Sequence, residues 1–312
     1  MKPLLCLTVL LLSAGPLPAS VRITTVRPAE TDPAITRPNQ PHRVYLDRAV
    51  SARGELLVYL PGTAAQTTDQ DHFGRLAATL GYHVVYIMYP NDTAAAVCNG
   101  DEDETTFEKF RREVISGGDL DPRVQVGRPD SIEHRLLALV RWLAAQKPDE
   151  GWGQFLDASG GLVWRKAALA GHSQGGGHAQ LMAKDHAVAR VIALGSPKDY
   201  NHRHGRPAAW YGGGATPPSR FFALIHEQDT QACTYAQQLE NLRASGLGSV
   251  AGIDGAAPPY GGAHVLVTNA PGGKVESAMA HLSLVFDFTL PRAGGRNLLA
   301  PAWEYLLTAP VG

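Results

Sequence analysis

The most informative segment of the sequence is Ala167-Ala168-Leu169-Ala170-Gly171-His172-Ser173-Gln174-Gly175-Gly176-Gly177-His178-Ala179. A short apolar run ends at Gly171, one serine follows, and small residues then begin a predicted helix. Glycines two residues before and two residues after Ser173 remove side chains that would clash in a tight strand-to-helix turn, and such a turn exposes the serine hydroxyl. The pattern therefore predicts a nucleophilic serine at position 173.

Strands and helices alternate on both sides of this turn. Short apolar runs predict strands at 42–50, 55–60, 82–88, 167–171, 189–194, 220–226 and 263–269. Apolar stripes predict helices at 69–80, 106–116, 130–146, 174–186 and 232–244, from about 280, and at 301–307. This rhythm is typical of right-handed crossovers in a parallel sheet. We expect an α/β fold with a mostly parallel sheet of about eight strands, flanked by helices, in one domain over residues 21–312.

Two segments depart from the rhythm. Residues 21–41 are rich in Thr, Pro and Asn, which favours an extended lead-in with little to bury. Residues 90–129 hold an acidic run at 101–104 and are predicted to be an insertion after the fourth strand that can act as a lid. After this insertion, Asp130 is predicted to cap the next helix, with Glu133 as its reciprocal partner.

The first 20 residues are typical of a secretory signal peptide. Lys2 supplies a positive charge, residues 4–12 form an apolar run, and residues 16–20 are a segment rich in small residues, as at the end of a signal peptide. We therefore expect a secreted or periplasmic protein without a stable membrane anchor. A formal net charge of −1 over 312 residues argues against a nucleic-acid partner.

Two cysteines, Cys98 and Cys233, remain after removal of this segment. In an oxidising compartment they permit one disulfide, and the alternative is a pair of unlinked buried thiols. Two distant cysteines without spaced histidines do not predict a metal site.

Three features of the sequence point to one superfamily: Gly171-His172-Ser173-Gln174-Gly175, the turn His226-Glu227-Gln228-Asp229, and the placement of His281 after the last predicted strand. In these features the chain resembles the α/β-hydrolase superfamily. Within that superfamily it resembles a secreted bacterial branch of serine esterases or lipases. The resemblance implies hydrolysis of a carboxylic ester through an acyl-enzyme, with no cofactor. It also implies the chain order serine, acid, histidine.

In that order, Asp229 is the predicted acid because it directly follows the strand at 220–226. Asp199 follows the preceding strand and is the alternative acid, and Glu227 is a third candidate. His281 is the predicted base, because it follows the last strand after a flexible stretch and lies at the start of an apolar run. His264 is its competitor.

Two further histidines, His172 and His178, flank the serine and are predicted to pack or hydrogen-bond rather than act as bases. For the oxyanion, the backbone N–H of Gln174 at a helix N-terminus is one predicted donor. The second is expected in the turn after Leu60, from Thr63 or Ala64.

The substrate is the least defined part of the prediction. Trp210 and Tyr211 are candidates for lining a substrate pocket, with a packing role as the alternative. The same three catalytic residues also suit a peptidase, an amidase or an acyltransferase. A non-catalytic binding protein on the same fold is the alternative outside enzymes.

Overall fold

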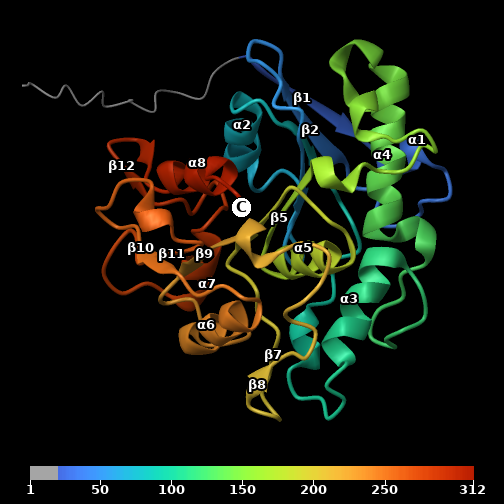
Figure 1. Cartoon of the computed structure of the whole chain (residues 1–312). Helices are drawn as coiled ribbons and strands as arrows, with labels where there is room; N and C mark the ends of the chain where they lie inside the picture. Colours follow the sequence, from blue (N-terminus) through green and yellow to red (C-terminus); the bar gives the residue numbers. More distant parts are fainter. Residues whose placement is uncertain (1–19) are drawn as a thin grey trace, which may run out of the picture.

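The computed structural model describes residues 20–312 and arranges them around one sheet of nine strands (Figure 1). In spatial order the strands are β1 (Val21–Val26), β2 (His42–Asp47), β4 (His83–Tyr86), β3 (Leu56–Leu60), β5 (Ala167–His172), β6 (Arg190–Leu194), β9 (Phe221–His226), β11 (Val265–Thr268) and β10 (Val250–Gly252). β1 with β2 and β2 with β4 are antiparallel, whereas every other neighbouring pair is parallel. The predicted α/β class with a mostly parallel sheet is confirmed.

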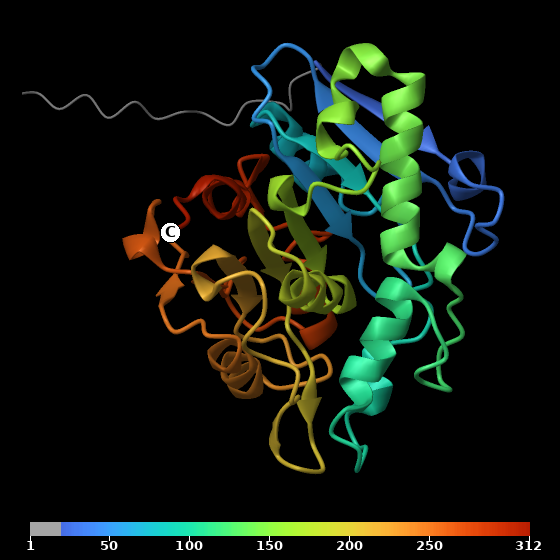
Figure 2. The same cartoon turned by 45° about the vertical axis from the view of Figure 1, so that its right-hand side comes forward.

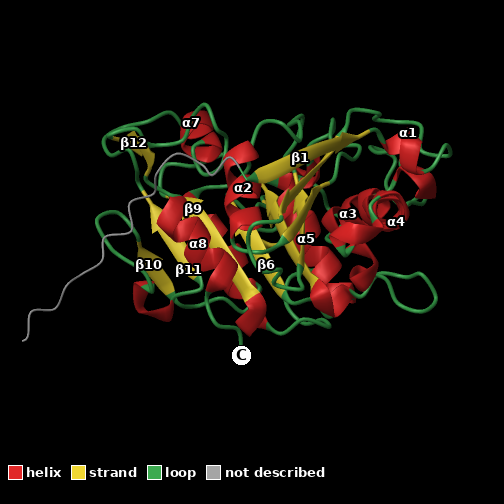
Figure 3. Cartoon of the chain, turned by 90° about the horizontal axis from the view of Figure 1, so that it is seen from above, coloured by secondary structure: helices red, strands yellow, loops and turns green. Residues whose placement is uncertain are grey.

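Helices cover both faces of the sheet, as the view from above shows (Figure 3). They are α1 (Pro28–Thr31), α2 (Asp71–Thr79), α3 (Thr106–Ser116), α4 (Ile132–Gln146), α5 (Gln174–Asp185), α6 (Tyr235–Ala244), α7 (Ser277–Leu282) and α8 (Ala300–Thr308). The buried side chains of α3, α4, α5 and α6 pack on one face, and those of α2 and α8 on the other. Figure 2 shows α3 and α4 following one another along the same side of the sheet.

Two short ribbons complete the described fold. One pairs β7 (Tyr200–Asn201) with β8 (Arg206–Pro207), and the other pairs β12 (Arg292–Ala293) with β13 (Arg296–Asn297). The predicted signal peptide, residues 1–20, lies outside the described residues except for Ser20.

Strand β3 shows why a continuous apolar run predicts a buried parallel strand. Each of its five residues is at most 1% exposed. Successive side chains of a strand point to opposite faces, so Val58 packs with the α3–α6 layer and Tyr59 with the α2–α8 layer. Because β3 lies between β4 and β5, its carboxyl end at Leu60 is next to the end of the strand that precedes Ser173.

Helix α3 anchors residues 90–129 in the core. Its side chains Phe107, Phe110 and Val114 are buried in the same cluster as side chains of α4 and α5. The segment follows β4 directly along the chain. Its action as a lid stays a prediction.

The expectation of an extended lead-in over residues 21–41 is wrong. Val21–Val26 forms β1, which pairs antiparallel with β2 along six residues. β1 is an edge strand, and only its end residues Val21 and Val26 are buried. The Arg and Thr residues between them left no apolar alternation in the sequence.

The capping prediction for α4 is wrong by one residue. Ser131, not Asp130, is the N-cap, and its hydroxyl accepts the His134 N–H at 3.4 Å. The Asp130 carboxylate instead accepts the Arg135 guanidinium at 2.9 Å and the Thr36 N–H at 2.9 Å. These partners are distant or charged donors that outcompete the helix N-terminus for the carboxylate.

Burial of α3 generates a stability prediction. Phe110→Ala removes a fully buried ring and leaves a cavity, so we expect the free energy of unfolding to fall by about 3–5 kcal/mol. Urea denaturation followed by far-ultraviolet circular dichroism measures this change. Lys109→Ala, an exposed neighbour on the same helix, is the control and changes it by less than about 1 kcal/mol. Equal stability of both variants would show that α3 is not part of the core.

Candidate active site

Ser173 lies between β5 and α5 in a strained backbone conformation. Its φ and ψ angles are 54° and −122°, a region that costs a non-glycine residue about 1–3 kcal/mol. The turn is held by its surroundings. A Cβ atom at Gly171 would lie 2.4 Å from the Gly175 backbone, and one at Gly175 would lie 2.1 Å from the Leu60 carbonyl oxygen. Both positions therefore require glycine for α5 to approach the end of β3.

Asp229 and His281, the predicted acid and base, are in direct contact. The Asp229 Oδ2 atom is 2.7 Å from Nδ1 of His281. An ionised carboxylate only accepts hydrogen bonds, so Nδ1 carries the proton and the neutral ring has a free lone pair on Nε2. This is the tautomer that a general base for a hydroxyl requires.

Ser173 and His281 line the same cavity, of about 280 Å³. Gln174 lies beside Ser173 in this cavity. Small and apolar side chains form much of its remaining wall: Ala94, Ala95, Ala96, Leu282 and Phe286. The structure thus brings the serine, the histidine and, through the histidine, the aspartate to one place at the carboxyl edge of the sheet.

The environment keeps the acid charged and the base neutral. Burial raises the pKa of Asp229, but the hydrogen bond and charge of His281, together with the Lys198 ammonium, outweigh it and lower that pKa to about 2. Burial lowers the pKa of His281 below its ordinary value, although Asp229 opposes this shift. At neutral pH the pair is therefore a carboxylate next to a neutral imidazole.

The predicted oxyanion donors lie at the start of α5 and in the turn after Leu60, and the Gln174 side chain connects these two segments. Gln174 is the first residue of α5, where the helix dipole favours negative charge. Its Oε1 atom accepts the Thr63 hydroxyl at 3.0 Å and the Ala95 N–H at 2.8 Å. Of the two alternatives in the turn after Leu60, Ala64 donates its N–H to the Asn91 carbonyl at 2.9 Å. No hydrogen bond among the described residues uses the Thr63 N–H, so of the two alternatives Thr63 has the N–H that is available to a ligand.

Asn91 was not anticipated from the sequence. Its side-chain amide donates to the carbonyls of Gly62 at 2.7 Å and Ala65 at 2.9 Å. It therefore fixes the turn that holds Thr63. A single Asn after the strand at 82–88 gave no sequence signal, because its partner groups are backbone atoms of a distant turn.

Asp199, the alternative acid, is committed to a different partner. Its two carboxylate oxygens each accept a hydrogen bond from the Arg111 guanidinium at 2.6 Å, and both side chains are buried. The same guanidinium donates to the Gln174 carbonyl at 2.9 Å. A Cβ atom at Gly177 would lie 2.3 Å from this guanidinium, so the third glycine of the elbow leaves room for an ion pair beneath α5.

The remaining acid and base candidates lie elsewhere or have other partners. Glu227 is exposed. His264 is 2.8 Å from the Phe221 carbonyl through Nδ1 and stacks on Phe222. His178 is buried against Arg111. The His172 ring packs 4.4 Å from the His281 ring, with its Nε2 3.1 Å from the His281 carbonyl, so it supports the base.

Trp210 and Tyr211, the candidates for lining a substrate pocket, lie outside the cavity of Ser173 and have the packing role that was the alternative. Trp210 is buried, and its indole N–H donates to Asp199 at 2.8 Å. The Tyr211 hydroxyl accepts the Asp199 N–H at 3.0 Å. Neither lines the cavity of Ser173; both pack around the Arg111–Asp199 pair, which the sequence could not reveal.

The predicted disulfide is not present. Cys98 and Cys233 are free, buried thiols, which is the alternative that the sequence left open. Burial raises the pKa of each thiol to about 12.

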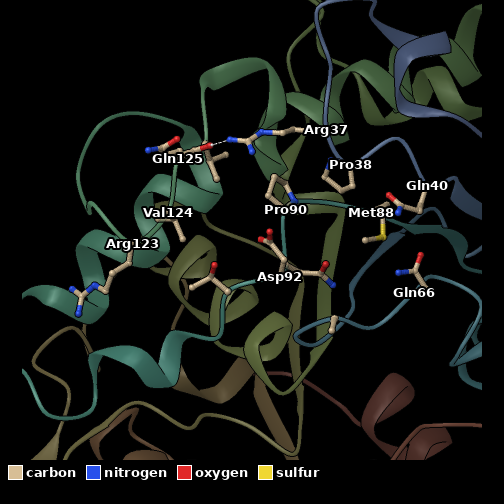
Figure 4. A pocket seen from close by; sticks show the side chains of 14 residues that line it. Arg37, Pro38, Gln40, Gln66, Met88, Pro90, Asp92, Arg123, Val124 and Gln125 are labelled. Atoms are coloured by element: carbon tan, nitrogen blue, oxygen red, sulfur yellow. Dashed lines mark hydrogen bonds between the residues drawn. The ribbon is translucent and has the colours of Figure 1, made fainter.

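A second, larger cavity has a volume of about 580 Å³, and Figure 4 shows the side chains that line it. Ala64 and residues 90–93 line it, whereas Thr63 and residues 94–96 line the cavity of Ser173. Its wall is polar, and the Arg37 guanidinium at its rim donates to the Gln125 carbonyl at 2.9 Å. Consecutive residues of the chain thus line two different cavities.

Within residues 20–312, no group of three or more His, Cys, Asp or Glu side chains is placed to hold a metal ion. The same residues contain no helix long and apolar enough to cross a membrane.

No protein-family model and no curated protein matches the chain. Among solved structures it is similar to a phosphonate-inhibited esterase B from Lactobacillus rhamnosis, at 15% identity over 94% of this chain and 88% of that one, with a TM-score of 0.48. It is also similar to a serine hydrolase homologue from Coxiella burnetii, at 15% identity over 76% and 85%, with a TM-score of 0.42. Esterase rPPE is similar at 13% identity over 93% and 82%, with a TM-score of 0.45.

The buried Arg111–Asp199 pair generates a stability prediction. Asp199→Asn leaves the guanidinium buried without its counter-charge, so we expect the free energy of unfolding to fall by about 3–5 kcal/mol. Urea denaturation measures this loss. Asp185→Asn, which removes an exposed partner of Arg112, is the control and costs less than about 1 kcal/mol. An Asp199→Asn variant as stable as the parent would contradict a structural role for this pair.

Proposed function

We propose that the protein is a secreted serine hydrolase that cleaves a carboxylic ester through an acyl-enzyme. The observation that carries the proposal is the 2.7 Å bond from His281 Nδ1 to Asp229, made by a histidine that lines the same cavity as Ser173. Strain at Ser173 supports it, because strained backbone is typical of functional sites. The export part rests on the sequence of residues 1–20 alone.

In the proposed mechanism, Ser173 Oγ attacks the ester carbonyl carbon while His281 Nε2 takes the hydroxyl proton. Asp229 holds the imidazole in the required tautomer and stabilises the imidazolium. The N–H groups of Gln174 and Thr63 then stabilise the oxyanion. His281 returns the proton to the leaving alcohol. A water molecule, activated by the same imidazole, hydrolyses the acyl-enzyme and frees Ser173.

The cavity supports a short acyl group as the substrate. Its volume of about 280 Å³ lies at the low end of ligand pockets. The side chains of Ala94, Leu282 and Phe286 provide apolar contact for a short alkyl chain. Ala64 and residues 90–93 of the larger, polar cavity follow or precede Thr63 and Ala94 of this site along the chain, and its polar wall suits a polar alcohol portion of the substrate.

The identity of the nucleophile is tested by covalent labelling. A fluorophosphonate probe is expected to label the parent protein, and Ser173→Ala is expected to abolish labelling and hydrolysis of p-nitrophenyl acetate, because the attacking oxygen is absent. Mass spectrometry of the labelled protein locates the modified residue. A folded parent protein that does not react would favour a non-catalytic binding protein.

Asp229→Asn is the companion variant in the same assay. It keeps the shape of the side chain but removes the charge that orients His281, so turnover is expected to fall by about 10⁴-fold. A p-nitrophenyl ester series of graded acyl length measures the substrate range, with butyryl or shorter chains preferred. A preference for long chains or for a peptide bond would overturn the assigned substrate.

Burial of His281 generates a prediction about pH. Because burial lowers the pKa of this imidazole below 6.5, the base stays neutral, and therefore active, to a pH below that value. We expect kcat/KM to reach half of its plateau on the acid side below about pH 6.5. Initial rates with p-nitrophenyl acetate in buffers of constant ionic strength measure this profile. A midpoint at or above pH 6.5 would contradict the assigned environment.

A further inference from the structure

Asp229 has a second cationic partner that no step of the proposed mechanism uses. Lys198, in the loop after β6, places Nζ 2.7 Å from Asp229 Oδ2, the same oxygen that binds His281. Lys198 is 6% exposed and lines the cavity of Ser173. Lysine is rarely buried unless it is paired, so this one is fixed by the carboxylate.

The geometry points to Lys198 as a positioning residue that holds Asp229 and keeps His281 in its neutral form in weakly acidic solution. This inference rests on the proposed function, since it concerns the base that activates Ser173. The Asp229 Oδ1 atom accepts the Gln231 N–H at 3.0 Å. With Lys198 and His281 on Oδ2, both oxygens are bound and the carboxylate has one orientation.

The electrostatic part follows from the shared oxygen. Lys198 Nζ and His281 Nδ1 are each 2.7 Å from Asp229 Oδ2, so they lie within the range of about 6 Å in which one charge shifts the pKa of another. The ammonium offsets part of the negative charge that would otherwise favour protonation of the imidazole. The pKa of His281 is lowered first by burial and also by this cation.

The other titratable groups around the pair are two histidines, one thiol and one ion pair. Burial holds the pKa of His172, on β5, well below its usual value, and also lowers that of His226, at the end of β9. The Cys233 thiol has a pKa raised to about 12 and stays protonated. The Arg111–Asp199 pair lies on the cavity wall as a matched ion pair. Lys198 is therefore the cation whose removal changes the field at His281.

The test compares pH profiles of kcat/KM for p-nitrophenyl acetate. Lys198→Met removes the cation, so the acid midpoint is expected to rise by about one unit. This rise corresponds to a loss of about tenfold well below the midpoint, measured relative to the activity of the same variant on its plateau. Lys198→Gln is expected to shift the midpoint similarly, because it keeps a donor without the charge. Lys198→Arg is expected to restore it.

The controls separate tuning from simple support of the loop. Lys184→Met removes a lysine that binds the carbonyls of Trp210 and Gly212 outside the cavity, and is expected to leave the midpoint unchanged. A loss of activity by the same factor at every pH, with the midpoint unmoved in both Lys198→Met and Lys198→Gln, would overturn the proposal. If Lys198→Met does not fold, Lys198→Gln and Lys198→Arg provide the same comparison of neutral and charged side chains.

A second measurement does not depend on turnover. In a Ser173→Ala background, nuclear magnetic resonance of the His281 ring gives its titration directly. Adding Lys198→Gln is expected to raise that titration midpoint by about one unit, and an unchanged midpoint would overturn the inference. If the parent protein neither hydrolyses esters nor reacts with the fluorophosphonate, the proposed function fails, while this titration still decides the coupling between Lys198 and His281.

Discussion

The close approach of α5 to the end of β3 is the constraint on which the site depends. Gly175 lies against the Leu60 and Pro61 carbonyls, so a side chain as small as a methyl group has no room there. This contact places the first N–H of α5 beside the turn that carries Thr63. It also leaves Ser173 with a positive φ that its neighbours enforce. A weak nucleophile is thereby held at a helix N-terminus, where developing negative charge is favoured.

Around this contact, buried charges are arranged in two separate pairs. Arg111 neutralises Asp199 beneath α5, while Lys198 and His281 share Asp229 at the cavity wall. Burying charge is costly unless each ion is matched and hydrogen-bonded. Two neighbouring aspartates can therefore differ in role although both follow strands of the same sheet. The partners, not the positions along the chain, distinguish them.

Much of this architecture could be predicted from the sequence, and the failures have a common cause. The buried strand β3 and the glycines around Ser173 have local signals, because burial on both faces and a tight turn each restrict the residues allowed. Contacts between distant segments have none. In the sequence Lys198 is indistinguishable from an ordinary loop lysine, and only the fold places it next to Asp229. Trp210 likewise suggests a pocket aromatic in the sequence, whereas in the structure its indole N–H donates to Asp199. The edge strand β1 has no clear sequence signal, because only its two end residues are buried.

Gln174 joins three parts of the chain through one carbonyl oxygen, since Thr63 and Ala95 both donate to it. The same segment, residues 90–129, contains Arg111, whose guanidinium packs against Gly177 and donates to the Gln174 carbonyl. Residues 90–129 therefore cannot be exchanged independently of the rest of the fold. Replacing this segment by a loop from another protein would remove the Arg111 counter-ion from Asp199. It would also remove the Ala95 N–H that donates to Gln174. Ala94, Ala96 and Leu282 differ, because their side chains line the cavity without belonging to either ion pair and can be replaced without uncovering a buried charge.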